Sequence, residues 1–263
     1  MSINIKKPKT SFLKNIVFEI GLNHLGSQSY FQEYVDAILK YKIKFVTIQL
    51  REKSFYIKSK NKLLPSIFLE EKLKFLQSQG VNVGLAICDY HFIDYIKNFN
   101  PDFFKILSWV AEDLKFIKNI NNYKKNIYIS LGMINNKSIY ALDKKLFKMN
   151  GKFNYIYTIL NYDENKLNLR LLPILKKKLK FGISYGHHAL DDIPFIIALA
   201  FEVDKIFIYV KSKKSKKHND EDHAIYLKDF PSFLKKIDKT NNYIGVAKKE
   251  ESINYMEKIY YEK

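Results

Sequence analysis

Three side chains that could do chemistry lie close together near the start of the chain: Glu19, Asn23 and His24. They follow an apolar run, and Gly21 and Gly26 would let the backbone come close to a ligand. A carboxylate, an amide and an imidazole can together hydrogen-bond a polar substrate and exchange protons with it. The segment therefore predicts a binding or catalytic site. A capped loop with an incidental histidine is the alternative.

A lysine interrupts an apolar run in the segment Phe104-Lys105-Ile106-Leu107-Ser108. If its side chain points into the core, its ammonium group needs a carboxylate partner or an anionic ligand. A side chain that reaches outward along the apolar surface to solvent is the alternative. Lys105 is thus a candidate anion-binding residue.

Two adjacent histidines, His187 and His188, end another apolar run, and Asp222-His223 follow a charged segment, 211–222. One histidine of an adjacent pair can supply a metal ligand, but a metal site needs further ligands that converge on the same ion. His91 and His218 have no assigned role.

The elements that must position these residues are strands alternating with helices. Eight runs rich in β-branched and aromatic residues are nearly continuous in hydrophobicity, which is typical of parallel strands covered on both faces. They are residues 16–20, 44–50, 81–87, 103–107, 126–131, 153–160, 180–184 and 203–210. Amphipathic segments between and after them predict helices over 30–39, 66–76, 113–120, 138–147, 168–175, 191–200 and 229–237.

Eight strands that alternate with helices predict an α/β fold, a single-domain (β/α)8 TIM barrel over residues 1–245. A doubly wound sheet is the alternative, but no G-x-G-x-x-G turn follows the first strand. Residues 246–263 are expected to form a short helical tail. Segment 51–65 is either a solvated loop or a lid over the barrel mouth, and 211–222 is a second polar loop.

Charge and composition exclude several function classes. The net charge is +18, from 45 basic and 27 acidic residues, but only Arg51 and Arg170 are arginines. Nucleic-acid binders favour arginine, so we expect no nucleic-acid partner and an attraction for anionic metabolites instead. The single cysteine, Cys88, excludes a disulfide framework. No apolar run reaches the roughly 20 residues of a membrane helix, and no signal peptide is evident, so we expect a soluble cytoplasmic protein without membrane contact.

Eight segments, in chain order, resemble motifs of the N-terminal domain of the sialic acid synthase family. FEIGLNHLGS (18–27) is similar to the family's AEIG-NHNG signature, and FVTIQ (45–49) to its V-K-F-Q strand. The other matches are KILS (105–108) with K-I-x-S-G-E, ISLGM (129–133) with L-S-T-G-M, Asn161-Tyr162 and 168–170 with S-x-Y-P and N-L-R, FGIS (181–184) and His187 with G-Y-S-D-H-T, and Asp222-His223 with D-H. The resemblance implies a (β/α)8 barrel followed by a small antifreeze-like domain, which we expect to be absent from this chain.

The resemblance also implies a reaction and its residues. The family condenses phosphoenolpyruvate with an N-acetylated amino sugar aldehyde, which a divalent metal, Mn²⁺ or Mg²⁺, polarises. Glu19 would contact the sugar or the attacking water, Lys105 would hold the phosphoenolpyruvate anion, and His187 would bind the metal. The implied substrate-binding residues are Asn23, His24, Gln49, Ser108, Ser130, Asn161, Tyr162, Ser184 and Asp222. Phosphoenolpyruvate and an amino sugar are the expected partners, and the resemblance allows a homodimer.

Three positions depart from the family pattern. Thr47 stands for a lysine, Val110 for a glutamate and Val210 for a second metal-binding histidine. The first hypothesis is therefore a divergent synthase. The alternatives are a non-catalytic barrel that binds a sugar or partners an active synthase, and a lyase or aldolase with Lys105 as Schiff-base amine.

Overall fold

A computed structural model describes residues 10–59, 62–212, 220 and 222–245. Eight parallel strands form a closed barrel in which each strand pairs with the next in sequence and β8 pairs with β1. The strands are β1 (Ile16–Gly21), β2 (Phe45–Leu50), β3 (Asn82–Ile87), β4 (Phe103–Ile106), β5 (Asn126–Ser130), β6 (Lys152–Tyr157), β7 (Gly182–His187) and β8 (Ile206–Lys211). The predicted barrel is confirmed.

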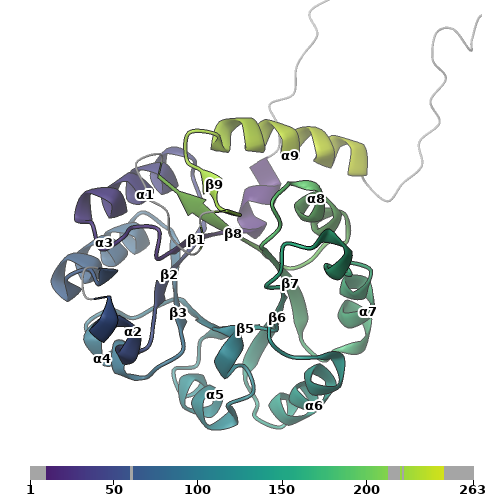
Figure 1. Cartoon of the computed structure of the whole chain (residues 1–263), viewed down its shortest axis with the longest axis horizontal. Coiled ribbons are helices and arrows are strands. Elements are labelled where there is room, and N and C mark those ends of the chain that lie inside the picture. Colours follow the sequence, from purple (N-terminus) through teal and green to yellow (C-terminus); the bar gives the residue numbers. More distant parts are fainter. Residues whose placement is uncertain (1–9, 60–61, 213–219, 221, 246–263) are drawn as a thin grey trace, which may run out of the picture.

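Helices surround the strands in a ring (Figure 1). They are α1 (Gln28–Lys40), α2 (Lys53–Lys58), α3 (Ser66–Ser78), α4 (His91–Tyr95), α5 (Leu114–Asn121), α6 (Asn136–Phe147), α7 (Leu171–Lys178), α8 (Ile193–Ala200) and α9 (Phe230–Ile244). A short strand, β9 (Ile225–Tyr226), extends the sheet from the end of β8. None of the described helices has both the length and the apolar character needed to cross a membrane.

The sequence explains where several helices begin. Ser27, Asp113 and Asn135 precede α1, α5 and α6, and the side chain of each accepts a hydrogen bond from the backbone N–H three residues later. Such caps satisfy one of the unpaired N–H groups at a helix start. All seven predicted helices are present. Helices α2 and α4 were not predicted, and the expected tail 246–263 lies outside the described residues.

Alternation along the strands separates two cores. Ile16, Phe18 and Ile20 of β1 belong to the large core between strands and helices, whereas the side chains between them face the barrel interior. The N-terminal half of that interior is filled by a buried apolar cluster, which we call the barrel plug. It consists of Val17, Phe103, Tyr128, Ile156 and Phe207, with Phe45 packed against it.

The plug consists of interlocked rings. The centroid of Tyr128 lies 5.5 Å from that of Phe103 and 5.3 Å from that of Phe207, and both ring pairs pack edge to face. One inward position further along β1 and β4, the side chains become Glu19 and Lys105. The interior therefore changes from apolar to charged toward the C-terminal ends of the strands, where barrel enzymes have their active sites.

Candidate active site

A cavity of about 150 Å³ lies at the C-terminal ends of the barrel strands. Its walls come from loops and strand ends far apart in sequence. The lining residues are Leu22, Gln49, Arg51, Lys105, Leu107, Ser108, Trp109, Ser130, Leu160, His188, Tyr209 and Asp220. A larger hollow of about 630 Å³ is lined mainly by apolar residues of the β5–α6 and β6–α7 regions. The smaller cavity is the better candidate because charged and hydroxyl groups converge in it.

Lys105 and Glu19 form a buried ion pair in the barrel interior. Lys105 Nζ contacts Glu19 Oε1, and the two side chains are 5% and 2% exposed. Thr47 Oγ1 also donates to Glu19 Oε1, at 3.5 Å. Glu19 Oε2 has no hydrogen-bond partner within the described part of the chain. Lys105 therefore points inward with a carboxylate partner, and the alternative of an outward side chain does not apply.

Hydroxyl groups line the cavity next to this ion pair. Ser108 Oγ and Ser130 Oγ lie 2.7 Å apart, on the loop after β4 and the end of β5. Tyr209 on β8 donates its phenol proton to Gln49 Oε1 on β2, at 3.4 Å. Burial, with a further contribution from the charge of Glu19, raises the pKa of Tyr209 well above 10. Tyr209 therefore stays protonated, and the site offers several neutral donors to an oxyanion.

An aspartate that sequence reasoning missed also lines the cavity. Burial and the nearby charge of Glu19 raise the pKa of Asp220 to about 6, although Lys105 opposes the shift. The predicted residue was Asp222, but its side chain is exposed and it is not among the lining residues. The charged segment 211–222 indicated that acidic groups were present, but it did not show which one turns inward.

The two adjacent histidines lie on opposite sides of β7. His187 packs against α8, with its ring centroid 6.2 Å from that of Phe195, and burial lowers its pKa to about 4. His188 lines the cavity and stacks on His223 with ring centroids 4.4 Å apart. Ile183, Tyr185 and His187 alternate onto the outward face of β7, and His188, the next residue, faces the cavity. The structure thus brings His188 to the cavity and leaves His187, the predicted metal ligand, outside it.

Asn23 and His24 hold the turn between β1 and α1. Asn23 Nδ2 donates to the backbone oxygen of Val210 at 2.7 Å, and His24 Nδ1 accepts from the backbone N–H of Gly26 at 2.9 Å. Neither residue lines the cavity. Their hydrogen bonds explain their types through turn geometry and the closure of the barrel between β1 and β8.

Three further predicted residues lie away from the cavity. Ser184 donates to Asn154 Oδ1 at 2.6 Å, in a polar group near the N-terminal ends of the strands. Asn161 is exposed and accepts from the backbone of the β6–α7 loop at 2.7 Å. Tyr162 is 43% exposed, and its hydroxyl lies 3.2 Å from His223 Nδ1. Gln49, Ser108 and Ser130 are the predicted substrate-binding residues that line the cavity.

The three departures from the family pattern have different positions. Thr47 faces inward beside Glu19, and Val110 packs against the helical core from a 3₁₀ turn. Val210 is fully buried in the core between strands and helices. A metal-binding side chain at position 210 could not reach the cavity. The neighbouring residue of β8 that does line the cavity is Tyr209, which has a phenol and no imidazole.

The donor set at the cavity does not fit a divalent metal. Among the described residues, no group of three or more His, Cys, Asp and Glu side chains could hold an ion. His188 is the imidazole at the cavity, and its pKa is lowered well below 6.5 by burial and by the neighbouring charges of His223 and Lys105. Glu19 is occupied by Lys105. The residues at the cavity therefore do not support a reaction step that depends on a bound metal.

Arg51 is a cationic lining residue that sequence reasoning missed. It follows β2 and lies two residues after Gln49, so alternation past the strand end could have suggested it. Three other lining residues were missed for different reasons. Trp109 lies in the 3₁₀ turn after β4, Asp220 lies in the charged segment 211–222, and Tyr209 is within a strand of mostly apolar residues.

Comparisons with known proteins agree with this architecture. The NeuB family model matches residues 31–249. N-acetylneuraminic acid (sialic acid) synthetase from Leptospira borgpetersenii has a TM-score of 0.80 at 18% identity, over 94% of this chain and 90% of that chain. A putative spore coat polysaccharide biosynthesis protein E from Chromobacterium violaceum has a TM-score of 0.76 at 16% identity, over 94% and 80%.

A more distant structure, a truncated 3-deoxy-D-arabino-heptulosonate 7-phosphate synthase from Thermotoga maritima, has a TM-score of 0.66 at 14% identity, over 88% of this chain and 89% of that chain. No curated protein sequence matches the chain. At these identities the structural likeness establishes the shared barrel fold.

Proposed function

The chain belongs to the NeuB family of sialic acid synthase-like proteins, and we propose that it condenses phosphoenolpyruvate with an N-acetylated amino sugar aldehyde in carbohydrate biosynthesis. The observation that carries this proposal is the buried Lys105–Glu19 pair beside Ser108 and Ser130, at the mouth end of a closed barrel. A buried ammonium group and adjacent hydroxyls form a site for an oxyanion.

The proposed reaction forms one carbon–carbon bond and one carbon–oxygen bond to water, and it breaks the carbon–oxygen bond to phosphate. The methylene carbon of phosphoenolpyruvate attacks the aldehyde carbon, water adds to the resulting oxocarbenium carbon, and phosphate leaves from that carbon. The aldehyde oxygen takes up a proton and the water loses one. Lys105 would bind an anionic group of phosphoenolpyruvate, and the hydroxyls of Ser108 and Ser130 would orient it.

Two carboxyl groups are suited to move these protons: Asp220, which lines the cavity, and Glu19, which is paired with the lining residue Lys105. Asp220, with a pKa of about 6, is close enough to neutrality to donate a proton to the aldehyde oxygen. Glu19 has one oxygen on Lys105 and the other without a hydrogen-bond partner among the described residues, and the second oxygen could accept a proton from water.

The assay is phosphate release from phosphoenolpyruvate with a panel of N-acetylated hexosamines, with and without Mn²⁺ or Mg²⁺, because the family resemblance implies a metal. We expect sugar-dependent phosphate release, a large loss in Glu19→Gln, and no loss in the exposed control Glu112→Gln. Folded protein that releases no phosphate with any sugar or metal contradicts the proposal.

A non-catalytic barrel that binds a sugar or partners an active synthase is the second candidate. The observation that favours it is that, among the described residues, no three His, Cys, Asp or Glu side chains converge to hold a metal ion. Binding of an amino sugar without turnover, or co-purification with an active synthase, would support it. A Schiff-base role for Lys105 is disfavoured because an ammonium group held by Glu19 is not a nucleophile.

A further inference from the structure

Arg51 enters the cavity from the start of the segment 51–65, for which the sequence allows either a loop or a lid. It lines the cavity together with Lys105 and Ser108, and its side chain is 21% exposed. Its backbone N–H donates to the hydroxyl of Tyr56, which is buried in α2, at 3.3 Å. Helix α2 therefore fixes the backbone from which the Arg51 side chain projects.

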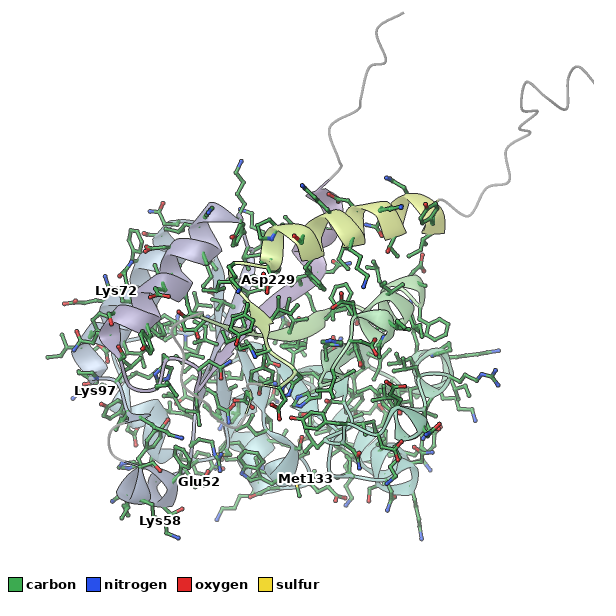
Figure 2. All side chains as sticks on the ribbon, turned by 45° about the horizontal axis from the view of Figure 1, so that its top comes forward. Glu52, Lys58, Lys72, Lys97, Met133 and Asp229 are labelled. Atoms are coloured by element: carbon green, nitrogen blue, oxygen red, sulfur yellow. The ribbon has the colours of Figure 1, made fainter. Side chains whose placement is uncertain are left out.

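The Arg51 guanidinium is held on one edge by its neighbour. Nε lies 2.9 Å from Glu52 Oε2, and Nη2 lies 3.0 Å from Glu52 Oε1. These hydrogen bonds lower the pKa of Glu52, so the pair is ionised. Figure 2 shows Glu52 on the α2 side of the molecule. Because a guanidinium has five N–H donors, the pair leaves the two hydrogens of Nη1 and one of Nη2.

Aromatic rings restrict the orientation of the same group. The Arg51 Cζ atom lies 4.6 Å from the ring centroid of Phe55 and 4.8 Å from that of Trp109. Cys88 Sγ donates to Glu52 Oε2 at 3.5 Å and steadies the carboxylate. The guanidinium is therefore held in place before a ligand binds, and Nη1 makes no hydrogen bond to any residue that the structure describes.

The charge of Arg51 also reaches the far walls of the cavity. It lowers the pKa of both Tyr209 on β8 and Asp220, against the larger opposite effect of burial on each. Lys105, by contrast, is already in contact with Glu19. Two cationic side chains thus lie among the described lining residues of the cavity: Arg51, directly after β2, and Lys105 on β4.

We propose that Arg51 is a substrate-binding residue whose Nη1–Nη2 edge grips one anionic group of phosphoenolpyruvate while Lys105 holds the other. This inference rests on the proposed function for the identity of the acid. A planar guanidinium forms two parallel hydrogen bonds to a carboxylate or phosphate, which a lysine cannot do. Arg51 would therefore set both the affinity for the acid and its orientation toward the sugar.

The test is calorimetric binding of phosphoenolpyruvate to the whole chain with Arg51→Met, Arg51→Lys and the matched control Arg170→Met. Arg170 lines the larger hollow rather than this cavity. We expect Arg51→Met to weaken binding about 10- to 100-fold, the range for charged hydrogen bonds. Arg51→Lys should recover only part of this loss, and Arg170→Met should bind as the unaltered chain does.

Steady-state kinetics provide the second measurement. Arg51→Met should raise the KM for phosphoenolpyruvate and leave the KM for the sugar unchanged, a split that a general loss of fold would not produce. Binding of phosphoenolpyruvate to Arg51→Met within about threefold of the unaltered chain overturns the inference but leaves the proposed function in place. No binding of phosphoenolpyruvate to the unaltered chain overturns both.

Discussion

The buried Lys105–Glu19 ion pair predicts an unusually large stability loss from a single change in the barrel interior. Lys105→Met keeps the length of the side chain and removes its charge, so packing changes little. Glu19, only 2% exposed, is then left as a carboxylate without its cation. Thr47 Oγ1, at 3.5 Å, is a weak donor that cannot replace an ammonium group.

The expected loss is about 3–5 kcal/mol, because breaking a buried pair leaves an uncompensated charge in the interior. At about 2–4 °C per kcal/mol for a chain of this size, the Tm should fall by at least about 6 °C. Glu19→Gln should recover most of this loss in the double variant, since the amide carries no charge. The coupling free energy between positions 19 and 105 should then exceed about 2 kcal/mol.

Urea unfolding of the two single variants and the double variant, followed by circular dichroism, measures this coupling. The matched control is Lys236→Met, which removes the surface pair between Lys236 and Asp192 at 2.9 Å. The side chain of Lys236 is 50% exposed, so its loss should cost less than about 1 kcal/mol. If Lys105→Met costs no more than Lys236→Met, the reasoning from burial is wrong.

Three further predictions follow from buried groups near the site. Burial lowers the pKa of His187 and His223 to about 4, so on acidification the unfolded chain binds protons at these histidines before the folded chain does. The free energy of unfolding measured in urea should therefore fall as pH drops from about 6.5 to about 4, and a flat profile would contradict this. Burial raises the pKa of Cys88 to about 12, so iodoacetamide at pH 8 should modify the folded chain at least about 100-fold more slowly than the unfolded chain, and equal rates by mass spectrometry would refute it. Gly132→Ala would place a Cβ atom 2.9 Å from Leu160 Cγ at the cavity wall. It should lower the free energy of unfolding in urea by about 1–3 kcal/mol and reduce phosphate release. Unchanged activity and stability would count against close packing between Gly132 and Leu160.

The barrel could be predicted because its strands are apolar on both faces. Runs such as 103–107 and 126–131 differ clearly from the amphipathic helices beside them, and pairing between neighbouring strands follows from the alternating order. Lys105 was found by the same contrast, as a charge within an apolar run. The ion pair with Glu19 could not be predicted, because it joins β1 to β4 across the barrel.

The differences between the predicted site residues and the residues that line the cavity have a common physical origin in the direction of side chains. His187 and His188 have the same residue type, and only the phase of β7 decides which one faces the cavity. Asp220 and Asp222 belong to a charged loop, where no periodicity indicates direction. Helix α2 was missed because a six-residue helix rich in lysine and serine carries too weak a pattern, although Phe55 and Tyr56 pack within it.

The barrel plug closes the N-terminal half of the barrel interior in the part of the chain that the structure describes. Arg51, Trp109 and Leu160 line the cavity where it meets solvent, so a molecule that binds at Lys105 enters and leaves beside them. In a cavity of about 150 Å³ with a shared entrance, a molecule bound near the entrance blocks the path of a second molecule to Lys105. Under the proposed function, phosphoenolpyruvate would therefore bind at Lys105 before the sugar binds, and the product would leave before another phosphoenolpyruvate binds.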